Sequence, residues 1–256
     1  MDNTNNILLK DVCNNYNNII NSKQYQNNTN TSYSDIPKTI IDLYKQTYLN
    51  QPIIIGISGI PGSGKSSLAL SIQNSINDLL NNTNNSQDTS QEICIILPMD
   101  GYHLYAKGLT SDQLKYRGRI DTFDLDRFNK DLINLSHNIK SNNLITLKFP
   151  NFDHKLKDPT DDGIQINLEI NKIILVEGIY LYNEKVNQDE FNLKLFIKSD
   201  IENSMNRVAK RSIEANICNN DEEALQRAFD NDLNNANYVL KNSILDKYML
   251  FVNYID

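Results

Sequence analysis

The stretch GIPGSGKS, residues 59–66, places two glycines, a lysine and a serine at the spacing G-x-x-x-x-G-K-S. Glycines at these positions let the backbone curl so that successive N–H groups point at phosphate oxygens. An apolar run precedes the stretch and a helical pattern follows it, which is the context that a phosphate-binding loop requires. The sequence therefore predicts a nucleoside triphosphate site. Its loop residues are Gly59, Ile60, Pro61, Gly62, Ser63, Gly64, Lys65, Ser66 and Ser67.

Lys65 and two later carboxylates could carry chemistry at such a loop. Lys65 is expected to reach the β- and γ-phosphates of ATP, and the Ser66 hydroxyl to ligate Mg²⁺. Asp100 ends the apolar run EICIILPMD, and Glu177 ends the run in KIILVEG. A carboxylate at a strand end can accept a proton from an attacking hydroxyl or hold Mg²⁺. We expect Asp100 to be the base and Glu177 a metal ligand; the alternatives are that Asp100 caps a helix and that Glu177 faces solvent.

Basic residues on a late helical pattern and the turn after the first carboxylate complete the candidate site. Arg207 and Arg211 lie four residues apart on one helix face, where they could stabilise charge on a transferring phosphoryl group. A solvated charged face is the alternative interpretation. Gly101 permits a tight turn that leaves Tyr102 and His103 to line a pocket. The guanine-reading pattern N-K-x-D does not occur, which makes a GTPase switch a minor alternative.

The elements that must position these residues alternate between apolar strands and helical patterns. Runs rich in β-branched residues predict strands within residues 52–58, 92–100, 172–178 and 192–200, and residues 143–152 are expected to be extended. Helical spacing occurs over residues 7–20, 36–50, 68–80, 125–139 and about 201–239. This alternation predicts an α/β fold with a parallel sheet covered by helices on both faces, and an added substrate-side subregion. Ligands bind beyond the carboxyl ends of such strands.

Composition limits the partners of the chain. A net charge of −7 over 256 residues argues against general binding to nucleic acid or membrane surfaces. The three cysteines lie far apart, without the spacing of a zinc site or a disulfide framework. No apolar run approaches the ~18 residues of a membrane span, and the acidic N-terminus has no basic segment of a signal peptide. We therefore expect a cytoplasmic protein.

Motifs along the chain resemble those of one family. The phosphate loop is followed in order by PMDGYHL, FPNFDHKLKDPT, ILVEGIYLY and RVAKR. Together they are similar to the motifs of the uridine kinase/phosphoribulokinase superfamily of P-loop kinases, particularly its fungal Yfh-type kinases and bacterial nucleoside/nucleotide kinases. The resemblance runs from about residue 52 to residue 239. It leaves residues 1–50 as a polar and helical extension of a kinase domain over residues 51–256, with residues 81–91 as a low-complexity surface insertion.

The resemblance implies a P-loop NTPase-type fold and an ATP- and Mg²⁺-dependent kinase that acts on a hydroxyl of a small molecule. It implies that Asp100 is the base, that Glu177 assists Mg²⁺, and that Arg207 and Arg211 are lid arginines. The acceptor is expected to lie among the motif segments and the loop LKYRGRIDTFD. The candidate substrate-binding residues are Tyr102, His103, Arg117, Phe152, Asp153 and His154.

Two departures from the family pattern concern the acceptor. Phe152 stands where uridine kinases carry a tyrosine, and the basic residues Lys115, Arg117 and Arg119 occupy the region of their acidic ribose clamp. Guanidinium groups pair with carboxylates or phosphates, although a solvated basic loop is equally compatible with the pattern. The leading expectation is a nucleoside or related metabolite; the alternatives are an anionic acid such as pantothenate or glycerate, and a regulatory protein that binds nucleotide without transferring phosphate. Whether the chain forms a homo-oligomer stays open.

Overall fold

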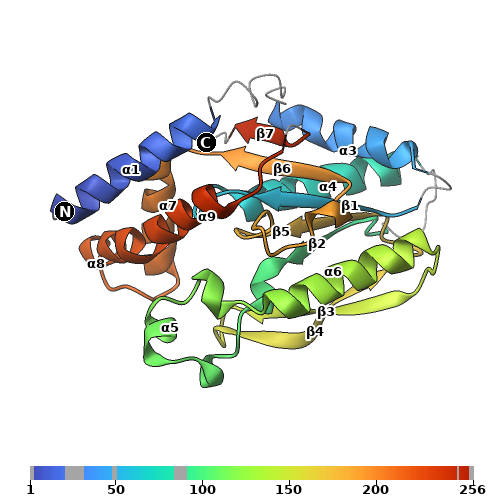
Figure 1. The fold of residues 1–256 in the computed structure, drawn as a ribbon. Helices are drawn as coiled ribbons and strands as arrows, with labels where there is room; N and C mark the ends of the chain where they lie inside the picture. The colour runs from blue at the N-terminus through green and yellow to red at the C-terminus, as the bar shows by residue number, and fades with distance from the viewer. Residues whose placement is uncertain (1–2, 21–31, 48–50, 84–90, 247, 254–256) are drawn as a thin grey trace.

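A parallel sheet of five strands forms the centre of the computed structural model, which describes residues 3–20, 32–47, 51–83, 91–246 and 248–253 (Figure 1). The strand order is β2-β5-β1-β6-β7, and every neighbouring pair is parallel. The strands are β1 (Ile53–Ser58), β2 (Cys94–Pro98), β5 (Ile173–Glu177), β6 (Leu193–Lys198) and β7 (Leu250–Asn253). The α/β fold and the four expected strands are confirmed, and β7 adds a fifth that the sequence patterns did not predict.

Helices cover both faces of this sheet because alternate strand side chains point to opposite faces. On one face Ile53, Ile55 and Ile57 of β1 pack with α3 (Ile36–Lys45) and α4 (Lys65–Thr83). Ile54 of β1 belongs to the larger core on the other face. The helices that contribute to that core are α1 (Asn3–Ile20), α6 (Leu125–Lys140), α7 (Ile201–Glu214), α8 (Asp221–Arg227) and α9 (Leu233–Asn242).

An antiparallel hairpin and a loop with short helices form the expected smaller subregion, below the sheet in Figure 1. The hairpin consists of β3 (Thr146–Asp153) and β4 (Asp158–Asn167), and the loop contains α5 (Ser111–Lys115). The extended segment expected at residues 143–152 corresponds to β3. The hairpin approaches the turn after β2 closely, since a Cβ placed on Gly101 would lie 2.4 Å from the carbonyl oxygen of Pro150.

The expectation of one long helix over about residues 201–239 is wrong. α7 ends at Glu214, and Asn216 adopts a φ of 53°, a left-handed conformation that asparagine tolerates better than most residues. Asn220 then caps α8 by accepting a hydrogen bond from the Glu223 N–H at 2.9 Å. A π-helical turn, η7 (Ala228–Asp232), separates α8 from α9. The asparagines therefore divide a segment whose hydrophobic spacing suggested continuity.

The N-terminal 50 residues contribute a helix to each face of the sheet. Val12 of α1 and Ile40 of α3 are both fully buried, in the larger and the smaller core respectively. Most of the insertion expected at residues 81–91 lies outside the described residues. None of the described helices has the length and apolar character needed to cross a membrane.

Candidate active site

The phosphate loop connects the fully buried strand β1 to the first turn of α4. Gly62 and Gly64 have φ values of 72° and 89°, the left-handed region that favours glycine. Lys65 is buried, and its Nζ donates a hydrogen bond to the carbonyl oxygen of Ile60 at 2.9 Å. In the described part of the chain the Ser63 hydroxyl is buried without a hydrogen-bond partner, which leaves it available to a phosphate oxygen. The loop therefore has the geometry predicted for a phosphate site.

Ser66 and Glu177 bring two oxygens together at the carboxyl edge of the sheet. The Ser66 Oγ donates a hydrogen bond to Glu177 Oε1 at 3.1 Å, and β5 places Glu177 beside Ile57 of β1. Glu177 is buried, and burial followed by the charge of Asp100 raises its pKa to about 7, although Lys65 acts in the opposite direction. Because the Glu177 carboxyl group ionises less readily in this site, a bound cation would stabilise its charged form.

This oxygen pair fits Mg²⁺. Magnesium prefers oxygen ligands and is usually held by one or two protein groups together with phosphates and water. Among the described residues, no three His, Cys, Asp or Glu side chains are grouped to hold a metal by themselves. Ser66 and Glu177 would therefore hold the ion together with a bound nucleoside triphosphate, as their sequence motifs predict.

Asp100 follows the neighbouring strand, β2, which pairs with β5 so that Pro98 lies beside Glu177. Its side chain is exposed, and its charge acts on both Glu177 and Lys65. The His103 ring nitrogen Nδ1 lies 2.9 Å from the carbonyl oxygen of Asp100 and closes the turn. The structure thus brings the predicted base, metal ligand and lysine to one edge of the sheet.

The electrostatic balance around Lys65 depends on this cluster. Burial, helped by Arg211, lowers the pKa of Lys65 to about 8, while Glu177, Asp100 and Asp232 act to raise it. Lys65 therefore loses its proton more readily than an exposed lysine does. A bound triphosphate would favour its charged form.

The two predicted lid arginines occupy different places. Arg211 is exposed and lies near enough for its charge to lower the pKa values of both Lys65 and Glu177. Arg207 lies behind the loop, where its Nε donates to the carbonyl oxygen of Gly62 at 2.8 Å. The lid role of Arg211 stays a prediction, whereas Arg207 braces the phosphate loop rather than extending over it.

The candidate acceptor side is formed by rings near Asp100. The His103 ring lies 4.0 Å from that of Phe123 and 5.1 Å from that of Phe152 between centroids. Arg117 lies over Phe152 at 5.6 Å and forms an ion pair with Asp158 at 2.7 Å. The predicted residues His103, Arg117 and Phe152 are thus brought together.

Three other predicted substrate residues have different environments. Tyr102 does not line the pocket: its side chain is 1% exposed, and its hydroxyl donates to Asp131 Oδ2 at 3.0 Å. Asp153 is engaged in the hairpin turn, where its carboxylate accepts from the N–H groups of Lys155 and Leu156 at 2.7 and 3.0 Å. His154 is exposed, with its ring 5.4 Å from that of Phe152. Their positions within the motifs did not distinguish these three residues from His103, Arg117 and Phe152, which do lie together.

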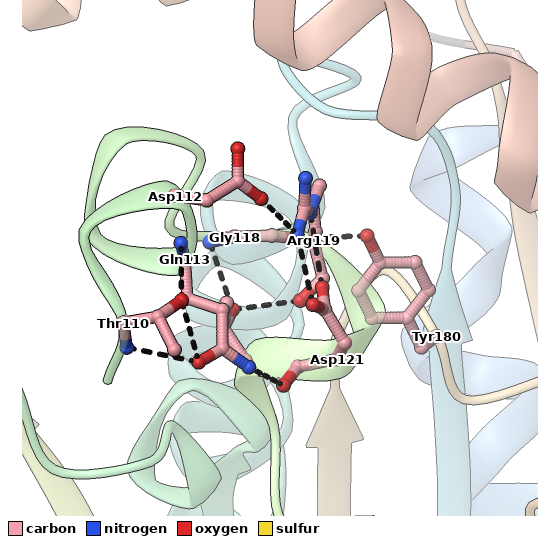
Figure 2. A network of polar contacts seen from close by, with 8 residues as sticks. Thr110, Asp112, Gln113, Gly118, Arg119, Asp121 and Tyr180 are labelled. Carbon is pink, nitrogen blue, oxygen red and sulfur yellow. Dashed lines mark hydrogen bonds and ion pairs between the residues drawn. The ribbon is translucent and has the colours of Figure 1, made fainter. Parts of the chain in front are cut away.

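The basic loop is largely neutralised by carboxylates of its own subregion. Figure 2 shows Arg119 between Asp112 and Asp121, with ion pairs of 2.9 Å to each, and Tyr180, which donates to the carbonyl oxygen of Gly118 at 2.8 Å. The pairing of Arg117 with Asp158 acts in the same way. The loop therefore offers an anionic substrate less attraction than its sequence suggests.

Two acidic residues near the site were not predicted. Asp158 is part of the motif FPNFDHKLKDPT, but its position there does not predict a role. Asp232 ends the π-helical turn, and burial raises its pKa to about 6 against the opposing charges of Arg227, Arg211 and Lys65. π-Helical turns often occur at functional sites, but the residue spacing in the sequence does not predict this π-helical turn.

Known proteins are similar to this chain over most of its length. A Schizosaccharomyces pombe protein named "Putative uridine kinase C227.14" is 30% identical over 229 residues, which cover 86% of this chain and 90% of that protein. The "ATP-dependent kinase YFH7" of Kluyveromyces lactis is 29% identical over 208 residues, covering 62% of this chain and 57% of that protein. The chain therefore matches nearly the whole S. pombe protein but little more than half of the K. lactis one.

Solved structures share the fold. YFH7 from Saccharomyces cerevisiae superposes with a TM-score of 0.75 at 19% identity, covering 88% of this chain and 100% of that one. A D-glycerate 3-kinase from Cryptococcus neoformans gives a TM-score of 0.55 at 13% identity, covering 87% and 95%. Likenesses at these identities support the P-loop kinase fold and say nothing about the acceptor.

The family model described as "Phosphoribulokinase / Uridine kinase family" matches residues 54–216. This range includes the phosphate loop, Asp100, Glu177 and both arginines of α7. It covers more than half of the chain and ends where α7 gives way to the left-handed Asn216. The chain therefore belongs to the phosphoribulokinase/uridine kinase family of P-loop, ATP-dependent kinases.

Proposed function

We propose that this chain transfers the γ-phosphoryl group of Mg-ATP to a hydroxyl group of a small molecule, as a uridine kinase does. The observation that carries this proposal is the hydrogen bond of 3.1 Å between Ser66 Oγ and Glu177 Oε1 beside the buried Lys65. The exposed carboxylate of Asp100 follows the neighbouring strand. A second carboxylate able to accept a proton supports a transferase rather than a site that only binds nucleotide.

Most of the rate enhancement would come from positioning and charge. Lys65 and the loop N–H groups would orient the triphosphate, and Ser66 and Glu177 would hold Mg²⁺, which neutralises charge on the phosphates. Asp100 would take the proton of the acceptor hydroxyl as its oxygen forms a bond to the γ-phosphorus. The bond between that phosphorus and the β–γ bridging oxygen breaks, and ADP leaves. Arg211 would stabilise charge on the transferring group.

A nucleoside is the acceptor class that we favour. The partly exposed rings of His103 and Phe152, the first of them backed by the buried Phe123, could stack against a planar base. Asp158, although paired with Arg117, retains carboxylate lone pairs that can accept from sugar hydroxyls. Because the ion pair with Asp158 balances the charge of Arg117, these residues would favour a neutral acceptor.

A kinase of an anionic acid such as pantothenate or glycerate is the second candidate. In the described part of the chain the Nε of Arg117 is buried and has no hydrogen-bond partner. A carboxylate or phosphate of the acceptor could accept from this donor. This donor is the specific observation that favours the second candidate.

A panel of acceptors with Mg-ATP tests the proposal. ADP release is measured with uridine, cytidine, pantothenate and glycerate, with the wild-type chain and with Asp100→Asn. We expect turnover with a nucleoside that falls at least a hundredfold in Asp100→Asn while ATP binding is kept. Turnover with acids alone would support the second candidate. ATP binding without turnover on any acceptor would indicate a regulatory protein, and full activity of Asp100→Asn would refute the base assignment.

A further inference from the structure

A continuous set of hydrogen bonds joins α1 to the phosphate loop, although α1 precedes the residues that the family model matches. Tyr16 of α1 is buried, and its hydroxyl oxygen accepts a hydrogen bond from the backbone N–H of Ser199 at 2.6 Å. We infer that Tyr16 is a positioning residue of the nucleotide site, which acts through Ser199 and Arg207 on the phosphate loop. The inference rests on nucleotide binding at that loop, as the proposed function requires.

Two serine hydroxyls next to the Tyr16 contact hold the guanidinium group of Arg207. Arg207 Nη2 donates to Ser199 Oγ at 2.5 Å and to Ser204 Oγ at 3.1 Å. Ser204 Oγ donates its single proton to the carbonyl oxygen of Asp200 at 2.7 Å. The Ser199 and Ser204 hydroxyl oxygens lie 2.7 Å apart, and both hydroxyls are within hydrogen-bond distance of the Asp200 carbonyl oxygen. Because Arg207 donates to both serine hydroxyls and to the Gly62 carbonyl oxygen, its guanidinium group is held in one orientation.

Arg207 connects α7 to the phosphate loop. Its Nε donates to the Gly62 carbonyl oxygen at 2.8 Å. α7 also touches the same glycine directly, since a Cβ placed on Gly62 would lie 2.2 Å from the carbonyl oxygen of Ser204. A shift of Ser199 and the first turn of α7 would therefore displace the apex of the phosphate loop.

Tyr16 matters because Ser199 directly follows β6, and the Tyr16 hydroxyl is the acceptor that the described part of the chain gives to its backbone N–H. Ser199 is 5% exposed, and a buried backbone N–H without an acceptor is costly. Burial raises the pKa of Tyr16, so the phenol stays neutral and suits a buried contact. Figure 1 shows α1 lying along α9 near the top of α7, and Val12 of α1 anchors it in the larger core.

Titration of Mg-ADP into the full chain tests the inference with Tyr16→Phe and with Tyr44→Phe as matched control. Tyr44 is a partly buried phenol on α3, against the opposite face of the sheet. We expect about tenfold weaker Mg-ADP binding for Tyr16→Phe, the effect of one lost buried hydrogen bond, and wild-type binding for Tyr44→Phe. Amide hydrogen exchange of residues 60–64 without nucleotide should accelerate only in Tyr16→Phe.

Equal affinities and equal exchange in Tyr16→Phe and the wild type would overturn the inference. If Tyr16→Phe does not fold, Ser199→Ala replaces it, because this variant keeps the backbone N–H bonded to Tyr16 but removes an acceptor of Arg207. It should also weaken Mg-ADP binding and accelerate loop exchange, and unchanged values would refute the proposed path. Neither measurement needs an acceptor, so a chain that shows these effects without any kinase turnover would refute the proposed function alone.

Discussion

Replacement of Gly62 by alanine should disrupt the contact between the phosphate loop and α7. Gly62 has a φ of 72°, and an added Cβ would lie 2.2 Å from the carbonyl oxygen of Ser204 and 2.9 Å from Val208 Cγ2. The first neighbour is helix backbone, which cannot rotate away as a side chain can. Either α7 must move or the loop must change conformation.

The cost can be worked from two contributions. A non-glycine residue in the left-handed region costs about 1–2 kcal/mol, and forced overpacking costs about 1–3 kcal/mol. We expect a loss of about 3 kcal/mol in the free energy of unfolding. For a protein of this size, about 2–4 °C per kcal/mol lowers the melting temperature by about 6–12 °C. Mg-ADP binding should weaken as well, because the displaced loop carries the N–H groups that face the phosphates.

Thermal unfolding followed by circular dichroism measures this effect, with Gly108→Ala as the control. A Cβ on Gly108 meets no atom within 4 Å in the described part of the chain, so this variant should stay within about 1 kcal/mol of the wild type. A melting temperature of Gly62→Ala within 2 °C of the wild type would refute the reasoning, because the contact between Gly62 and the backbone of α7 would then have room for a Cβ atom.

Three further predictions address the site. Lys65→Ala should abolish Mg-ATP binding in a calorimetric titration because it removes the buried cation of the loop; retained binding would contradict its role. The carboxyl group of Glu177 keeps its proton up to about pH 7 when folded and only to about 4.5 when unfolded, so the folded state binds more protons between these values and loses stability as pH rises. Glu177→Gln should remove that loss of stability and, in EDTA at pH 8, raise the free energy of unfolding by up to about 3 kcal/mol. The same variant should raise the Mg²⁺ concentration that ATP binding requires. An unchanged melting curve would contradict this prediction, and substitution of the exposed Glu169 by glutamine is the control. Tyr102→Phe should cost about 1 kcal/mol of stability through the lost bond to Asp131 and leave the KM for the acceptor unchanged; a raised KM would return this tyrosine to the pocket.

The nucleotide half of the site was predictable because each of its residues is adjacent to a strand end. β1, β2 and β5 are continuous apolar runs, and in a parallel sheet their carboxyl ends must meet at one edge. Asp100 and Glu177 follow two of these ends directly, so their proximity to Lys65 followed from local pattern alone.

The acceptor half was less predictable because its residues come from loops and a hairpin. Tyr102 and His103 are neighbours in the sequence, yet one is buried against Asp131 and the other lies among the rings. The charge of Arg117 is balanced by Asp158 of the hairpin and that of Arg119 by Asp112 of the loop, and only the folded chain brings these carboxylates near. Side-chain direction in irregular segments depends on packing that no periodicity records.

The amino-acid sequence by itself determined the phosphate loop, the strands that carry its partners, and the family, because these depend on short-range spacing and on runs of apolar residues. Only the tertiary structure decided which side of the loop Arg207 occupies, and that Tyr16 lies against Ser199, 183 residues away. Such contacts arise when helices dock on a common core, and their partners are chosen by burial and hydrogen-bond satisfaction rather than by position in the chain.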